Sequence, residues 1–393
     1  MQFVKMEDLK PGMRIARPIY SKKGVLLFER DSKLNASGID SIRNFGLLGL
    51  FVLEPAEPAP PMTPEDIEFE RFQTINSFAI KDELDSMLNT HKFIKLPTIV
   101  SDIIRSYGYL DKKINFAQSL RTKEDYIYRH CLNVAMLVAL MGHKYGLRND
   151  ELNDAVTSAV VHDIGKLMAP AELQDKDDRD DNDEEAMERY QTEGFDILDD
   201  MFQTSPNVKR IAAQTLNILQ RYRYGGDKAN MKLVEGTKVM TVAEFFDAHT
   251  AMRFGGKPES ELDVIRKMQE APDTFDKRAV KALVDSINIL SEGISVVLST
   301  GDTALILQEN PKNILRPVVL CFRDNAIMNL ADTYMYGDIE VADVMKTLDN
   351  RYVMDKRTLD EHSDDAAGGA DGGAADGASG DAAGAGDGVN GEA

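Results

Sequence analysis

The first 53 residues alternate short apolar runs with turn-forming residues. Two such runs, Arg14–Tyr20 and Val25–Phe28, flank a Lys-Lys-Gly turn, and short apolar segments bounded by turn residues are typical of strands. Apolar residues at helical spacing predict a helix over 36–45, and the apolar run Gly49–Leu53 predicts a closing strand. We therefore expect residues 1–53 to form a small β-rich module.

The pattern changes after this module. Five prolines between positions 55 and 64 predict an extended, semi-rigid linker over 54–64. From about Glu65 to Leu290 the apolar residues recur every three to four positions, which predicts a series of helices. The acidic stretch Asp175–Glu185 interrupts this periodicity, and we interpret it as a solvated loop rather than a metal site.

The C-terminal end differs again in composition. Residues 358–393 are mostly Ala, Gly, Ser and acidic residues, and they carry nine of the acidic residues behind the net charge of −20. A segment with so little apolar bulk cannot offset the entropy lost on folding, so we expect a disordered tail that aids solubility. The acidic charge of the whole chain excludes nucleic-acid binding as a main function, because a phosphate backbone requires a basic surface.

Candidate chemistry lies in the helical region. His162 and Asp163 are adjacent at the end of an apolar run, and neighbouring imidazole and carboxylate groups can bind one divalent metal. Lys166 follows one turn later, where it could hold a phosphate oxygen. Upstream, His130 lies on the apolar stripe of a predicted helix, so it is expected to be buried. This combination is typical of a metal-dependent phosphohydrolase.

The motifs resemble those of the HD superfamily of metal-dependent phosphohydrolases, and in particular its HD-GYP branch, which is associated with bacterial cyclic di-GMP signalling. The resemblance covers most of residues 1–320. It rests on Met6–Met13 with Gly24–Leu27, on Asp125–His130 and His162–Lys166, on Val242–Ala248 with Arg253, and on Ser295–Ala304 with Arg316–Val319. It implies an HD-type helical domain over 65–357 that ends in a short β-hairpin. The expected fold is therefore mainly α, with a β-rich module before this domain and a disordered tail after it.

Several histidines of that family have no counterpart in this chain. Where the family has His-Pro-x-x-Gly, this sequence has Tyr190-Gln-Thr-Glu-Gly, and where it has a His-His-Glu cluster before Gly-Tyr-Pro, this sequence has Leu219-Gln-Arg-Tyr-Arg-Tyr-Gly-Gly. The chain contains no histidine between His162 and His249. The resemblance therefore implies at most one metal, Fe, Mn or Zn, where the family holds two or three.

The resemblance also assigns roles to residues. The metal ligands would be His130, His162, Asp163 and Glu244, and Glu244 stands where the family has the shorter aspartate, so it would need a shift of its helix or rotamer. Asp163 and Lys166 would be the catalytic pair, and Arg253 would contact the nucleotide. Asp247 and Arg253 could alternatively form a structural pair on one helix.

Two functions remain open. The chain could be an HD-GYP-type module with a degenerate site that hydrolyses weakly or only binds, or an active phosphohydrolase that uses a one-metal site. We expect a cyclic dinucleotide or another nucleotide as the ligand. A signalling protein partner and a homodimer remain open.

Composition adds the cellular setting. Of the 393 residues 43% are apolar, but no apolar run reaches the roughly 20 residues of a membrane-spanning helix, and the N-terminus lacks the apolar core of a signal peptide. Only Cys131 and Cys321 occur, which fits a reducing compartment. We therefore expect a cytoplasmic protein without membrane attachment.

Overall fold

The computed structural model describes residues 2–21, 25–45, 47–53, 63–174, 176, 179–225, 232–252, 258–310 and 312–344. Four expectations from the sequence lie outside the described residues: the Lys-Lys-Gly turn at 22–24, most of the linker at 54–62, the role of Arg253, and the tail at 358–393.

The N-terminal module is β-rich, as expected. Its strands form a three-stranded antiparallel sheet in the order β1-β5-β2 and a separate β3-β4 pair. Apolar residues of the sheet and of α1 make a small core that includes Ile15, Ile42 and Leu50. The elements are β1 (Gln2–Lys5), η1 (Met6–Asp8), β2 (Arg14–Ile15), β3 (Ile19–Tyr20), β4 (Leu26–Phe28), α1 (Ala36–Arg43) and β5 (Gly49–Leu53).

Helices make up the central part of the chain. They are α2 (Pro64–Thr90), α3 (Leu96–Tyr107), α4 (Tyr126–Tyr145), α5 (Asn149–Val161), the 3-10 turn η2 (Ile164–Met168), α6 (Ala171–Gln174), α7 (Asp181–Met201), α8 (Asn207–Tyr224), α9 (Glu235–Thr250), α10 (Glu261–Glu270) and α11 (Lys277–Val284). None of the helices in the described part of the chain is both long and apolar enough to cross a membrane.

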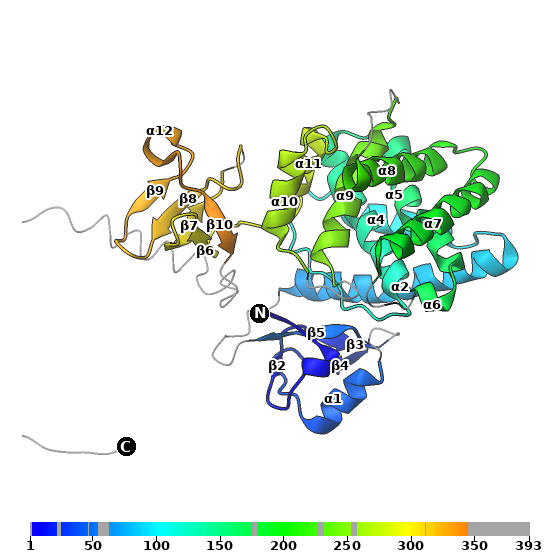
Figure 1. Ribbon diagram of the computed structural model, residues 1–393, viewed down its shortest axis with the longest axis horizontal. Helices are drawn as coiled ribbons and strands as arrows, with labels where there is room; N and C mark the ends of the chain where they lie inside the picture. The colour runs from blue at the N-terminus through cyan, green and yellow to red at the C-terminus, as the bar shows by residue number, and fades with distance from the viewer. Residues whose placement is uncertain are drawn as a thin grey trace, which may run out of the picture. The chain divides into compact units, whose positions relative to one another are not determined.

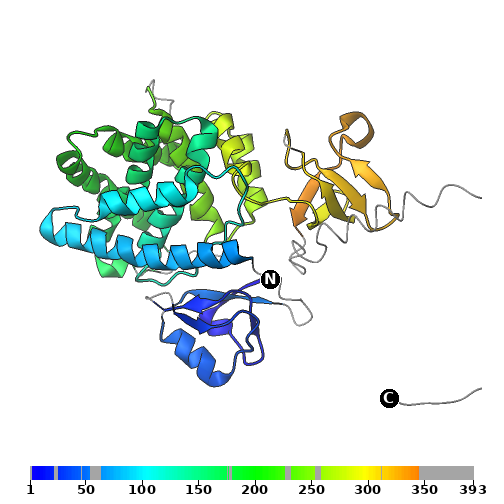
Figure 2. The ribbon, with the colours of Figure 1, turned by 180° about the vertical axis from the view of Figure 1, so that it is seen from behind.

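Helix α4 lies at the centre of this domain (Figure 1). Residues 130–142 are buried on every face of the helix, and a helix that is apolar all round packs only where other helices surround it. Helices α2, α5, α9 and α11 all contact α4. On one side, α2 and α3 lie next to each other (Figure 2). Polar side chains on α4 therefore face the interior of the domain.

The C-terminal part is a small antiparallel sheet. Its strand order is β10-β6-β7-β8-β9, and β6 and β7 form the hairpin expected from the sequence. The other strands enlarge that hairpin into a five-stranded sheet, and the short helix α12 follows β9. The elements are β6 (Ser295–Leu298), β7 (Thr303–Gln308), β8 (Val318–Cys321), β9 (Ile327–Asn329), α12 (Thr333–Tyr336) and β10 (Val341–Val344).

The mainly helical fold with strands at both ends is confirmed, but two local boundaries differ from the expectation. Pro64 is the first residue of α2 rather than the last of the linker, because Thr63 caps the helix and proline is favoured in a first turn. The second half of the acidic stretch is not a loop. Asp180 caps α7, and acidic residues in a first turn stabilise the helix through its dipole.

Candidate metal centre

Three parts of the helical domain bring the candidate ligands together. His130 comes from the central helix α4, His162 and Asp163 follow the end of α5, and Glu244 comes from α9. One ligand atom each from His130, His162 and Asp163 lie within 4.8 Å of one another, and all three residues are buried. In the part of the chain that the structure describes, this is the only such group of three or more possible ligands.

Carboxylates hold the imidazole of His130 at both ring nitrogens. Its Nδ1 lies 2.6 Å from Asp247 Oδ2, and its Nε2 lies 3.0 Å from Glu244 Oε1 and 3.8 Å from Asp163 Oδ2. Burial opposes the charged form of His130, but the carboxylates of Glu244 and Asp247 outweigh it and raise its pKa to about 9. Donation from Nδ1 to Asp247 leaves Nε2 directed at the other ligands, which is the usual arrangement of a metal-binding histidine.

His162 presents its other nitrogen to the same space. Its Nδ1 donates to the carbonyl oxygen of Ala159 at 2.8 Å. Its Nε2 is buried and faces Glu244 Oε2 at 3.0 Å, but neither of these two atoms makes a hydrogen bond of good geometry among the described residues. Buried polar atoms without partners are costly. A divalent cation would satisfy both atoms at once, so the residues present fit a metal.

The carboxyl group of Glu244 lies between the two imidazoles, with oxygens 2.9 Å from His130 Nε2 and 3.0 Å from His162 Nε2. Although burial opposes its ionisation, the two histidines hold the pKa of Glu244 well below its usual range. The longer side chain of Glu244 therefore reaches both histidines from α9.

Asp163 is oriented by two further side chains. Lys166 donates to Asp163 Oδ2 at 2.9 Å, and Gln191 donates to Asp163 Oδ1 at 2.7 Å. Burial opposes the charge on Lys166, but Asp163 and Glu244 outweigh it and raise the pKa of the ammonium group. Lys166 therefore carries a fixed positive charge beside the site.

Two glycines allow α7 to approach this point. A Cβ atom at Gly165 would lie 2.0 Å from the carbonyl oxygen of Tyr190, and one at Gly194 would lie 2.5 Å from the backbone nitrogen of Gly165. The close contact between η2 and α7 brings Gln191 onto Asp163. Tyr190, which precedes Gln191, contributes its carbonyl group to this contact.

One turn before Gln191, α7 contacts α8 through an ion pair and not through further candidate metal ligands. Glu188 accepts hydrogen bonds from Gln220 at 3.0 Å and from Arg223 at 2.9 Å. Gln220 and Arg223, in and beside the stretch Leu219–Tyr222, thus bind another side chain of the protein.

The contact of Asp247 with His130 was not predicted from the sequence. Asp247 is fully buried, and it accepts from His130 Nδ1, from Arg121 at 2.6 Å and from Asn133 at 2.9 Å. Burial raises the pKa of a carboxyl group, yet Arg121 and His130 hold that of Asp247 below its ordinary value. Its spacing of three residues from Glu244, on the same face of α9, was the available signal. Its ionic partner is Arg121, which is distant in sequence.

Comparison with known proteins agrees with this geometry. Residues 109–278 match the family model described as HD domain, and this range contains every candidate ligand. The match supports assigning this helical region to the HD superfamily. A cyclic di-GMP phosphodiesterase of Pseudomonas aeruginosa is 24% identical over 204 residues, which are 52% of this chain and 49% of that relative. The chain thus matches about half the length of the relative.

Proposed function

We propose that this protein belongs to the HD-GYP type and acts in cyclic di-GMP signalling through a reduced, one-metal site. Its main activity would be binding a cyclic dinucleotide, with hydrolysis that is slow or absent. The observation that carries this proposal is the convergence of His130, His162 and Asp163 with the Glu244 carboxylate, where two buried ligand atoms face each other at 3.0 Å without a hydrogen bond of good geometry. The similarity to a cyclic di-GMP phosphodiesterase supports the choice of ligand.

In this proposal each side chain has a defined task. His130, His162, Asp163 and Glu244 hold one divalent metal, and Asp247 fixes the orientation of His130. Lys166 neutralises a non-bridging phosphate oxygen, because its ammonium group lies at the site and the carboxylates of Asp163 and Glu244 raise its pKa. When bound, the metal supplies a Lewis acid that polarises a phosphoryl oxygen and lowers the pKa of water.

Efficient diester hydrolysis needs stabilisation on both sides of the reacting phosphorus, and a two-metal site supplies it. Here Gln191 and Lys166 both donate to the Asp163 carboxylate, and Glu188 is engaged by Gln220 and Arg223. Losing one such stabilising element typically costs on the order of a hundredfold in rate. We therefore expect one metal per chain and slow turnover.

The test is to load the purified protein with Mn, Fe or Zn and to measure metal per chain, binding of cyclic di-GMP and its hydrolysis. We expect one metal, saturable binding of the dinucleotide, and turnover below about 1 per second, an ordinary enzyme rate. Two or three metals at full occupancy, or turnover above that rate, would contradict the proposal.

Histidine substitutions sharpen this test. Because Gln191 already touches Asp163, Gln191→His should add a metal ligand and increase turnover. Tyr190→His restores the family residue on the adjacent position, and Glu193→His, at an exposed position of α7, is the matched control that should change neither quantity. If all three variants gain metal equally, the site is not limited by missing ligands.

The alternative is an active phosphohydrolase with one metal. The observation in its favour is that Lys166 and Gln191 both remain directed at Asp163, so the polar surroundings of the metal position are intact. Hydrolysis of a phosphomonoester such as p-nitrophenyl phosphate, without saturable binding of cyclic di-GMP, would favour this alternative.

A further inference from the structure

Residues 117–122, which precede α4, lie between the N-terminal module and the residues that hold His130. We call them the 117–122 segment. On one side, the side chain of Leu120 packs against the apolar core of the module. The Leu48 amide donates to the Arg121 carbonyl at 2.9 Å, and Leu47 forms an isolated β-bridge with Thr122. The module therefore holds this segment by both its side chain and its backbone.

On the other side, two side chains of the segment enter the polar network of the metal centre. Gln118 accepts from Asn133 Nδ2 at 2.9 Å and donates to Thr250 Oγ1 at 2.8 Å. Arg121 donates to Asp247. Asn133 donates its second hydrogen to Asp247 Oδ1, while Asp247 Oδ2 accepts from His130. A continuous series of hydrogen bonds thus leads from Gln118 to a candidate metal ligand.

The side-chain amide of Asn133 is fully used in this network. Asn133 uses both hydrogens of its amide, and its oxygen accepts from Gln73 at 3.1 Å. Gln118, Asn133 and Asp247 are all buried, so none of them can exchange a partner for bulk water. In such a network, a displaced member leaves unsatisfied groups that cost free energy, and the neighbouring side chains must readjust.

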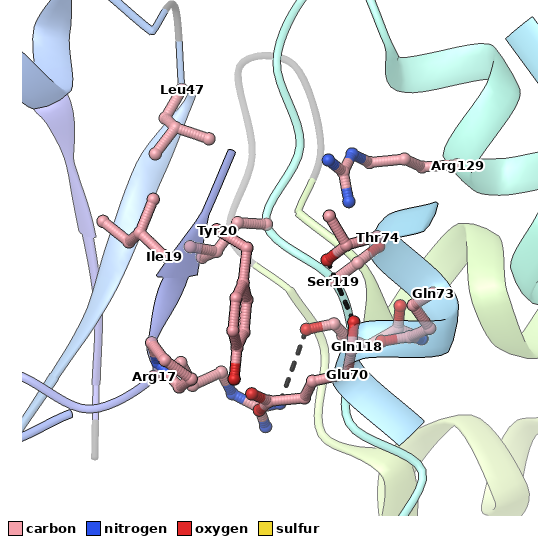
Figure 3. A pocket seen from close by; sticks show the side chains of 12 residues that line it. Arg17, Ile19, Tyr20, Leu47, Glu70, Gln73, Thr74, Gln118, Ser119 and Arg129 are labelled. Atoms are coloured by element: carbon pink, nitrogen blue, oxygen red, sulfur yellow. Dashed lines mark hydrogen bonds between the residues drawn. The ribbon is translucent and has the colours of Figure 1, made fainter. Parts of the chain in front are cut away.

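A cavity beside the segment contributes the rest of the contact (Figure 3). It is lined by Arg17, Tyr20 and Leu47 of the module, by Glu70 and Gln73 of α2, and by residues of the segment including Gln118. Its volume of about 60 Å³ is well below the roughly 300 Å³ or more of small-molecule sites and suits a few water molecules. The cavity is therefore too small to be a nucleotide site.

We propose that the N-terminal module controls the metal affinity of the site through the 117–122 segment, with Gln118 and Arg121 as positioning residues that act on His130 through Asn133 and Asp247. This inference rests on the proposed metal centre. Coupling between sites is reciprocal, so metal binding should in turn strengthen the contact between the module and the segment.

The first test uses Gln118→Leu with Gln214→Leu as the matched control. Both glutamines are 6% exposed and fully hydrogen-bonded, but Gln214 bonds to Lys232, Val234 and Thr237 rather than to the network of the metal centre. Measured by calorimetry with Mn²⁺ alone, the affinity should fall about tenfold in Gln118→Leu, because partners of a ligand typically contribute 10–100-fold. The control should stay within about twofold, and an equal loss in both variants would overturn the inference.

The second test separates the module from the network. Leu120→Asn removes the apolar contact with the module without touching a ligand, and Met13→Asn disturbs the same module core from outside the segment. We expect Mn²⁺ affinity to fall about fivefold for Leu120→Asn, at the lower end of usual coupling, and to stay unchanged for Met13→Asn. A Leu120→Asn variant with the Mn²⁺ affinity of the wild-type protein would overturn the inference.

Two further measurements report on position rather than stability. In the metal-free protein, the Nδ1 proton of His130 should give a strongly downfield resonance that moves upfield in Gln118→Leu, while the resonances of His162 stay in place. In the wild-type protein, Mn²⁺ should slow hydrogen exchange of the Leu48 amide. An unchanged His130 resonance, or unchanged exchange at Leu48, would overturn the inference. Wild-type protein that binds no Mn²⁺ would instead overturn the proposed metal centre itself.

Discussion

The buried ion pair between Arg121 and Asp247 gives the sharpest prediction. Both side chains are fully buried, and Asp247 accepts from Arg121, His130 and Asn133. Asp247→Asn preserves shape but replaces one oxygen by a donor. If the amide nitrogen takes the place of Oδ2, it faces the donors of His130 and Arg121, and if it takes the place of Oδ1, it faces that of Asn133. Neither orientation satisfies the network.

The expected cost has two parts. Arg121 loses its carboxylate in an environment without water, and removing one member of a buried pair typically destabilises a protein by about 3–5 kcal/mol. His130 also loses the group that fixes its ring, which should weaken metal binding about 10–100-fold. The double variant Arg121→Met, Asp247→Asn removes the stranded charge. It should recover all but about 1–2 kcal/mol of stability, since replacing a whole buried pair is often nearly neutral, yet its metal affinity should stay low.

The assay is denaturant unfolding of the metal-free protein in a chelator, combined with Mn²⁺ titration of each variant. A loss of less than about 1 kcal/mol in Asp247→Asn would contradict the argument from buried charge. Full metal affinity in the double variant would show that Asp247 does not position His130.

Three other predictions concern the site and its surroundings. Asp163→Ala should abolish metal binding, as measured by elemental analysis, while the helical circular dichroism stays the same; retained metal would exclude Asp163 as a ligand. Burial raises the pKa of Glu70 from 4.5 to about 7 against the opposing effect of Arg17 and Arg30, so the folded state favours the protonated form. The resulting contribution to the free energy of unfolding, at most about 3 kcal/mol, is present below pH 4.5 and is lost as the pH rises through 7. Glu70→Gln should remove this dependence, so the difference in unfolding free energy between the two proteins should change with pH. A difference that stays constant with pH would contradict this prediction. Gly165→Ala should destabilise the protein by more than about 1 kcal/mol and reduce metal affinity, because its Cβ would lie 2.0 Å from the Tyr190 carbonyl oxygen; a melting temperature equal to that of the wild type would refute this.

The sequence by itself determined the elements and the kind of chemistry. Helical periodicity predicted the helical region, and alternating short runs predicted the β-rich module, because these patterns depend only on the spacing of apolar residues. The sequence also predicted the pair His162-Asp163 and the buried position of His130. These polar residues stand out because their neighbours on the same helix face are apolar. The charge of the acidic stretch predicted a solvated loop, but its second half begins α7, because Asp180 caps that helix.

Only the tertiary structure decided which residues complete the site. Arg121 and Asp247 are 126 residues apart, and no spacing links them until the segment before α4 packs against α9. The contact of Gln191 with Asp163 depends on the approach of two helices at Gly165 and Gly194. The contact between Leu120 and the module core likewise joins segments that are far apart in the sequence. Such partners are chosen by packing and by the need to satisfy buried polar groups, and both are properties of the folded chain.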